Sequence, residues 1–321
     1  MSNVSSDLPA HAGSFDYDVI VVGARCAGSP TAMLLARQGH RVLLIDRATF
    51  PSDSMRAHLV RGGGSACLAR WGLLDRVLAT NCPPIRRTVL DLGDGPLSQP
   101  VAEREAWPVI CCPRRYALDA LLLDAAAEAG VVVEAGCRVE ALLWEDDRVV
   151  GIRARTKRGQ AIARARLVVG ADGLHSFVAR AVGAPTYRGA TPAMSCCYYG
   201  YFADVPLDAD EIAFVADRFL VAAPTNDGLA LVAVAAPIAE FAAFRADIET
   251  SFYRSFDRAP WLAERIAGGR RVERWRGTAD LPNFFRRPQG PGWALVGDAG
   301  YHQDPITAQG ISNAFIGADL L

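Results

Sequence analysis

An apolar run of β-branched residues leads directly into a glycine-rich turn close to the start of the chain. Residues 19–22 form this run, and Gly23 and Gly28 follow it before a helix-like apolar stretch. A second apolar run, residues 41–46, ends in Asp46, which lies 23 residues after Gly23 and so close to the expected offset of about 20. This spacing predicts a strand, a turn, a helix and a second strand that together bind a dinucleotide. The pyrophosphate would lie at the helix N-terminus, and Asp46 would bind ribose hydroxyls.

One position in this turn departs from the dinucleotide pattern. Arg25 stands where a middle glycine would let the backbone approach the phosphates. An arginine there must either point away from the pyrophosphate or reach over it as a cation. In the first case, glycine should be tolerated at position 25.

Two later segments repeat the change from an apolar strand to a glycine-containing turn. Residues 164–170 lead into Ala171-Asp172-Gly173, and residues 293–296 lead into Gly297-Asp298, followed by the loop 305–310. Three such turns can converge at the carboxyl edge of one parallel sheet, where sheets of this type bind ligands.

These three motifs, in this order and spacing, resemble those of the FAD-dependent aromatic hydroxylases typified by para-hydroxybenzoate hydroxylase. The wider superfamily includes geranylgeranyl reductases and flavin-dependent halogenases, and the resemblance extends over residues 16–321. It implies that the first motif binds the ADP part of FAD and that Asp298 holds the ribityl chain. It also implies that residues 305–310 lie under the flavin and that Asp172 and Gly173 serve both FAD and a pyridine nucleotide. Arg115 matches an Arg-x-x-Leu motif and is expected to contact the flavin.

The residues expected to bind the cofactor are spread over the whole chain. They are Gly23, Arg25, Cys26, Ala27, Gly28, Asp46, Arg47, Arg115, Val139, Asp172, Gly173, Gly297, Asp298, Pro305, Gln309 and Gly310. No metal site is expected. The side chains that could do acid–base work are His58, Tyr301, His302 and Arg56, and a structural role is preferred for His302.

The third motif differs from the hydroxylase pattern at several positions. The chain has Gly300-Tyr301 where Ala-His is usual, Ala308 where a glycine is usual, Ser312 for Asn and Gly317 for Asp. Since Asp298, Pro305 and Gly310 are retained, we expect a side branch of the family that keeps its flavin site.

Composition excludes several classes of partner. The 321 residues carry a net charge of −1, which gives no basic surface for a nucleic acid. No apolar stretch is long enough to span a membrane, and no signal peptide is evident. The eight cysteines show no metal-ligand spacing, so buried free thiols in a reducing cytoplasm are expected. The expected partner is a small-molecule substrate, and the oligomeric state is left open.

The expected fold class is α/β, with a Rossmann-like FAD-binding domain and a smaller α+β substrate domain of antiparallel strands and helices. Residues 1–15 are expected to be a flexible tail, 16–185 and 275–321 the discontinuous FAD-binding domain, and 186–274 the substrate domain. A hairpin at 86–102 could join the second sheet. The aromatic spacing in 238–268 predicts helix packed on that sheet. Because the chain ends inside a helical pattern, the FAD-binding domain is expected to be C-terminally incomplete.

The expected function is an FAD-dependent oxidoreductase, most simply a monooxygenase that uses NAD(P)H and O₂ to hydroxylate an aromatic or polyketide-like molecule. An FAD-dependent reductase of an isoprenoid C=C bond is kept as an alternative, because Phe50-Pro-Ser-Asp53 resembles that branch. A halogenase is disfavoured because Lys157 is the only lysine and the family's Trp-x-Trp-x-Ile-Pro motif is absent from the sequence. A non-catalytic flavin-binding remnant is the remaining alternative.

Overall fold

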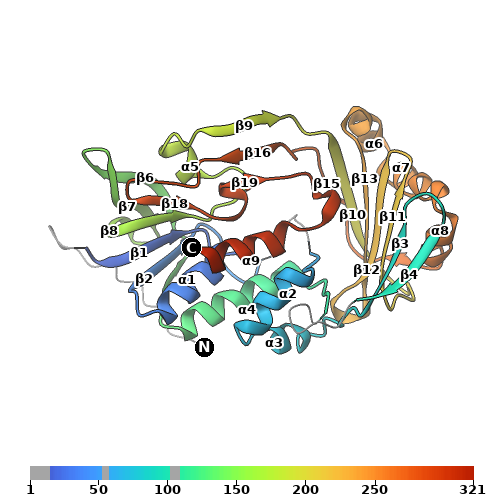
Figure 1. The fold of residues 1–321 in the computed structure, drawn as a ribbon, viewed down its shortest axis with the longest axis horizontal. Coiled ribbons are helices and arrows are strands. Elements are labelled where there is room, and N and C mark those ends of the chain that lie inside the picture. Colours follow the sequence, from blue (N-terminus) through green and yellow to red (C-terminus); the bar gives the residue numbers. More distant parts are fainter. Residues whose placement is uncertain (1–14, 53–57, 102–108) are drawn as a thin grey trace.

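The computed structural model describes residues 15–52, 58–101 and 109–321. The expected tail, apart from Phe15, and the positions Asp53 and Arg56 lie outside these residues. Figure 1 shows a first sheet with helices along one face, a second sheet at the other end of the molecule, and a small third sheet above α9. The expected fold class is confirmed.

The centre of the first sheet is parallel. Its strands run in the order β17-β18-β8-β1-β2-β5, and every pair from β18 to β5 is parallel. The carboxyl ends of β1, β2, β8 and β18 therefore meet at one edge, as the three motifs predict. The bounds are β1 (Tyr17–Val22), β2 (Val42–Asp46), β5 (Val132–Ala135), β8 (Gly159–Gly170), β17 (Gln289–Gly290) and β18 (Trp293–Leu295).

Both faces of this sheet are buried, because alternate residues of each strand enter different cores. Val19 and Val21 pack in one core, whereas Ile20 and Val22 pack in the other. This explains why the strands are continuously apolar in sequence. The helices of the first face are α1 (Gly28–Arg37), α2 (Gly62–Arg70), α3 (Leu74–Leu78), α4 (Arg115–Glu128) and α9 (Gly310–Leu320). The second face is covered by α5 (Phe177–Ala181) and the antiparallel strands β6 (Arg138–Glu145) and β7 (Arg148–Thr156).

The contact between α2 and α9 explains two features of the sequence. Residues 62–64, three consecutive glycines, form the first turn of α2. A Cβ on Gly64 would lie 2.7 Å from Ser312 Oγ, so only glycine allows this close approach. Ser312, one of the departures from the family pattern, uses its hydroxyl to accept a hydrogen bond from the Arg61 amide at 3.0 Å.

The second sheet has the order β14-β10-β13-β12-β11-β3-β4, with β15 beside β10. It is antiparallel except where β11 pairs with β3. The hairpin expected at 86–102 is confirmed as β3 and β4, and it joins this sheet. The bounds are β3 (Arg87–Asp91), β4 (Pro96–Pro100), β10 (Ser195–Ala203), β11 (Asp210–Val215), β12 (Arg218–Pro224), β13 (Ala230–Pro237), β14 (Arg270–Arg271) and β15 (Arg276–Thr278).

The aromatic-rich segment 238–268 packs on the outer face of the second sheet, as expected. It is divided into α6 (Phe241–Ala246), α7 (Ile248–Ser255) and α8 (Pro260–Ile266). Asp247 ends α6 in a non-helical conformation and caps α7 by accepting a hydrogen bond from Thr250 N. Pro260 then begins α8, where its fixed φ and missing N–H are tolerated.

A third sheet of three strands, β9 (Thr186–Thr191), β16 (Asn283–Arg286) and β19 (Tyr301–His302), lies in the order β19-β16-β9. The division into domains at 185, 186–274 and 275 stays a prediction. Two sheets combine strands from both expected domains. The strands β3 and β4 precede residue 185 but lie in the second sheet, and β9, which follows it, pairs with β16 of the segment 275–321. No helix in the three described ranges is long and apolar enough to cross a membrane.

We predict that Phe252→Ala strongly destabilises the second sheet and its helices. Phe252 is 0% exposed, and its ring centroid lies 4.3 Å from that of Trp275. Removing a buried phenyl ring costs about 3–5 kcal/mol. Chemical denaturation followed by tryptophan fluorescence should show a large fall in the midpoint. Tyr253→Ala is the control, because Tyr253 is 37% exposed. Equal losses in the two variants would contradict the assigned core.

Candidate functional site

A cavity of about 910 Å³ lies at the carboxyl edge of the first sheet and extends to the second sheet. Its wall includes the last residues of β1 and β2 and the turns that follow β8 and β18. It also contains all but one of the residues expected at the cofactor. These are Gly23, Arg25, Cys26, Ala27, Asp46, Arg47, Arg115, Val139, Asp172, Gly173, Gly297, Asp298, Pro305, Gln309 and Gly310. Their individual contacts with FAD stay predictions.

The exception, Gly28, lies behind the wall at the first residue of α1. A Cβ there would be 1.7 Å from the Gly23 carbonyl oxygen, and a Cβ on Gly23 would be 2.4 Å from that of Ala171. Gly23 also has a φ of +103°, which favours glycine. The two glycines thus let the first turn pack against the second. They leave the N-terminus of α1, whose first turn contains no acidic residue, at the cavity.

Asp46 is held beside the first turn. Its Oδ2 accepts a hydrogen bond from Ala24 N at 2.7 Å, and its Oδ1 accepts one from Ala48 N at 2.7 Å. The carboxylate therefore has a fixed orientation at the tip of β2, which is the geometry expected of a ribose ligand.

Arg25 and Arg115 meet at one carboxylate on α4. Arg25 Nη1 lies 2.5 Å from Asp119 Oδ2, and Arg115 Nη2 lies 2.9 Å from Asp119 Oδ1. Sequence reasoning missed Asp119. The sequence feature that could have identified it is the spacing, since Asp119 follows Arg115 by four residues and is flanked by apolar residues in the helix.

Asp172 has a structural use in addition to its place in the wall. Its carboxylate accepts hydrogen bonds from Ser176 Oγ at 2.5 Å, Phe177 N at 2.6 Å and Val178 N at 3.2 Å. It thereby satisfies amides at the start of α5. Burial raises the pKa of Asp172, and these hydrogen bonds act in the opposite direction.

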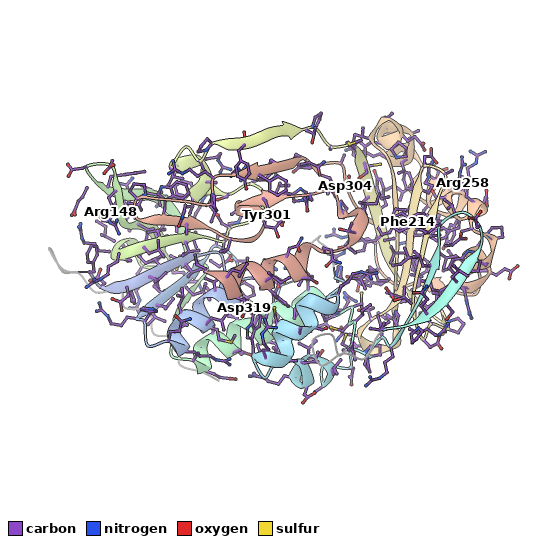
Figure 2. The ribbon with its side chains drawn as sticks, in the orientation of Figure 1. Arg148, Phe214, Arg258, Tyr301, Asp304 and Asp319 are labelled. Carbon is purple, nitrogen blue, oxygen red and sulfur yellow. The ribbon has the colours of Figure 1, made fainter. Side chains whose placement is uncertain are left out.

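The third turn comes close to the first. A Cβ on Gly297, which has a φ of +59°, would lie 2.8 Å from the Ala27 Cβ. Ala308 adopts the left-handed conformation with a φ of +51°. This strain accounts for the glycine that the family usually has there. Figure 2 places Asp304 near the second sheet, where Asp304 Oδ2 accepts a hydrogen bond from Ser195 Oγ at 2.6 Å.

The three described candidates for acid–base work all line the cavity. His302 Nδ1 donates to the Pro282 carbonyl oxygen at 2.5 Å, which supports the preferred structural role. The Tyr301 ring is stacked on Phe285, and burial together with the charge of Asp298 raises the pKa of Tyr301.

His58 belongs to the part of the wall nearest the second sheet. Its Nε2 lies 2.5 Å from the Tyr201 hydroxyl, and its ring packs edge-on against Tyr199. Burial, together with Arg115 and two further arginines, lowers the pKa of His58 well below its usual range. The imidazole is therefore neutral at pH 7.

The wall of the cavity is chemically divided. Most of its charged residues come from the first sheet and its connections, namely Arg25, Asp46, Arg47, Arg115, Arg138, Glu140, Asp172, Arg180 and Asp298. Asp280 follows β15 and Asp304 follows β19, so both lie in connecting loops outside the first sheet. The second sheet contributes uncharged residues, namely Cys197, Tyr199, Phe219, Val221, Leu231, Ala233, Ala235, Gly277 and Thr278. Burial raises the pKa of Cys197 to about 12, so its thiol is not a nucleophile at neutral pH.

This arrangement fits FAD on observations of the chain itself. The glycines leave space that a Cβ would fill, α1 presents its N-terminus, and Asp46 lies where a ribose would be bound. The uncharged half of the cavity is left for a second, apolar molecule.

Curated relatives of similar sequence are archaeal reductases. The digeranylgeranylglycerophospholipid reductase of Methanosarcina mazei is 27% identical over 304 residues, which cover 93% of this chain and 72% of that protein. The enzyme of the same name from Methanocella arvoryzae is 29% identical over 306 residues, with 93% and 74% covered.

Solved structures of similar fold include enzymes that act with FAD. The myxobacterial chondrochloren halogenase CndH, an FAD-dependent halogenase, has a TM-score of 0.84 and 26% identity, with 94% of this chain and 72% of that chain covered. PqsL from Pseudomonas aeruginosa, described as a probable FAD-dependent monooxygenase, has a TM-score of 0.77 and 23% identity, with 94% and 84% covered. At that identity, PqsL supports the fold alone.

The family model described as FAD binding domain matches residues 16–254, which is more than half of the chain. The resemblance drawn from the three motifs is therefore confirmed. The chain belongs to the FAD binding domain family, and it is an FAD-dependent oxidoreductase.

Proposed function

We propose that this oxidoreductase is an NAD(P)H-dependent monooxygenase that hydroxylates an aromatic or polyketide-like small molecule. The observation that carries the proposal is the division of the cavity wall into a charged half and an uncharged half. The charged half suits a dinucleotide, and the uncharged half suits a flat apolar substrate.

The second-sheet wall favours a substrate without a charge at that end. The wall includes the small residues Ala233 and Ala235 of β13, which pair with Val221 and Phe219 of β12. A substrate gains about 25 cal/mol for each Å² of apolar surface buried there. A carboxylate placed against this wall would lose its hydration, and none of the second-sheet residues described in the wall is a cation.

Bound FAD would supply the redox chemistry by accepting two electrons and passing them on. The chain itself would hold the cofactor at the three turns and exclude water with the apolar wall. His58, neutral and hydrogen-bonded to Tyr201, could exchange a hydrogen bond with a substrate hydroxyl or carbonyl group. This gives the substrate one polar anchor in an otherwise apolar half.

NAD(P)H is proposed as the reductant because of the Asp172–Gly173 motif. Arg180 of α5 and the exposed His175 also line the cavity next to this motif. A guanidinium at that point suits a nucleotide phosphate. These positions support a transient pyridine nucleotide at the open side of the site.

A reductase of an isoprenoid C=C bond is the second candidate. It is favoured by the relatives named digeranylgeranylglycerophospholipid reductase and by the same apolar wall, which could also receive a prenyl chain. A halogenase is less well supported. Lys157, the only lysine, is exposed between β7 and β8 and is not part of the cavity wall. A non-catalytic remnant is not retained, since the family and relatives indicate an enzyme.

Asp46→Ala should weaken FAD binding by about 10- to 150-fold, because a hydrogen bond to a charged group contributes about 1.5–3 kcal/mol. Flavin fluorescence titration of the apoprotein would measure the change. Asp147→Ala, in the turn between β6 and β7, removes the same charge away from the cavity and should bind FAD normally. Unchanged affinity in Asp46→Ala would show that this carboxylate does not bind the ribose.

Ala233→Phe should separate substrate binding from cofactor binding. A phenyl ring would fill the apolar half, so stimulation of NAD(P)H oxidation by apolar substrates should fall at least tenfold, whereas FAD affinity should change less than about twofold. Ala243→Phe on the outward side of α6 is the control. If Ala233→Phe loses FAD equally, the proposed division of the cavity is wrong.

The reaction class can be decided with ¹⁸O₂. We expect that the enzyme, supplied with NAD(P)H and an aromatic or polyketide-like substrate, forms a product that carries one labelled oxygen atom, as detected by mass spectrometry. Saturation of a prenyl double bond without oxygen, under anaerobic conditions, would instead establish the reductase.

A further inference from the structure

Arg25 is the one large side chain at a position where the dinucleotide pattern calls for glycine. The structure fixes its guanidinium from two sides. Nη1 lies 2.5 Å from Asp119 Oδ2, and Nη2 donates to Ser52 Oγ at 2.9 Å. The guanidinium carbon also lies over the Phe50 ring, 5.3 Å from its centroid. Arg25 is therefore positioned by three residues from two segments of the chain, the loop at 50–52 and α4.

The Arg25 side chain nevertheless keeps one surface at the cavity. It is 28% exposed, and it lines the wall together with Gly23, Cys26 and Ala27. These neighbours belong to the turn just before α1, whose N-terminus is open to the cavity. The exposed part of Arg25 thus lies at the end of the cavity where an anion would meet the helix N-terminus.

Asp119 offsets only one of the two guanidiniums that it binds at this end of the cavity. The side chain of Asp119 is 0% exposed and receives Arg25 and Arg115 at the same carboxylate. Arg115 Nε and Nη2 both contact Asp119 Oδ1, at 3.2 and 2.9 Å, and Cys26 Sγ lies 3.3 Å from it. Within this group of three described residues one guanidinium charge is not balanced by a carboxylate, and both cations line the wall.

The other acids at this end of the cavity have different expected partners. Asp46 is held at the tip of β2 by two backbone amides, and Asp298, which acts electrostatically on Arg115, follows β18. Both are expected to meet hydroxyl groups of FAD rather than its phosphates. The pyrophosphate is the negatively charged part of the cofactor, and it is therefore the part that a cation would bind.

We propose that Arg25, positioned by Asp119 and Ser52, is a direct ligand of the FAD pyrophosphate. In place of a backbone that approaches the phosphates at a glycine, this chain uses a preorganised side-chain cation. The interaction with a phosphate oxygen is a charge-assisted hydrogen bond, and its geometry is fixed before the cofactor binds. The inference depends on FAD binding and not on which reaction the enzyme catalyses.

The test uses Arg25→Met, which keeps most of the side-chain volume and removes the charge. Affinities of the apoprotein for FAD, ADP and adenosine would be measured by flavin fluorescence and calorimetry. We expect FAD and ADP, which contain the pyrophosphate, to bind about 10- to 100-fold more weakly, and adenosine to bind as it does to the unchanged protein. The dependence of FAD affinity on salt should also become less steep.

The control is Arg254→Met, which removes the same charge from the exposed side of α7 and should leave all three affinities unchanged. Arg25→Lys keeps the charge without the planar fork, so it should retain the salt dependence and bind FAD with intermediate affinity. Arg25→Lys also provides the test if the methionine variant does not fold, as judged by circular dichroism of the apoprotein.

Two results would overturn the proposal. Normal FAD and ADP binding by folded Arg25→Met would place the guanidinium outside the phosphate contacts. An equal loss of ADP and adenosine affinity would show that Arg25 only supports the shape of the turn. For Arg25→Lys, FAD binding that no longer depends on salt would show that the charge at position 25 does not contact the pyrophosphate, and it would also overturn the proposal.

Discussion

The site depends on three turns that approach one another more closely than ordinary side chains would allow. The first turn lies against the second where a Cβ on Gly23 would be 2.4 Å from the Ala171 carbonyl oxygen. The third turn lies against the first where a Cβ on Gly297 would be 2.8 Å from Ala27. Each turn follows a strand of the parallel sheet, so the register of β1, β8 and β18 brings them to one edge. A larger residue at either glycine would separate the turns and open the wall of the cavity.

Charge is concentrated on one side of that cavity. Burying a carboxylate there is unfavourable, and neighbouring guanidiniums compensate for it. Asp119 is buried, and a carboxylate without a partner in such a place would be strongly destabilising. Asp119 receives Arg115 from its own helix and Arg25 from the first turn, so this buried ion group connects α4 with the turn and fixes the geometry of the cofactor end. The second sheet contributes the opposite environment, an uncharged wall whose outer face is covered by α6, α7 and α8.

Motif residues do not all serve the cofactor through their side chains. The Asp172 carboxylate satisfies amides at the start of α5, and His302 donates to a backbone carbonyl. Ala308 occupies a left-handed conformation that a glycine would adopt with less strain, and Ser312 fits against Gly64 where α2 and α9 meet. These positions maintain the loops around the site, which explains how the chain departs from the family pattern there while the cavity is kept.

The sequence by itself determined the parallel sheet, its three turns and the acid at the tip of β2, because strand periodicity and glycine positions are local properties of the chain. It also predicted the hairpin of β3 and β4 and the helical region that covers the second sheet. It could not reveal Asp119 as the partner of Arg25, nor Tyr201 as the partner of His58, since these pairs join residues that are 94 and 143 positions apart. Only tertiary packing decides which distant side chains share a buried space. That packing placed an uncharged wall opposite a charged one, and it held the Arg25 side chain against Asp119 with one surface left at the cavity.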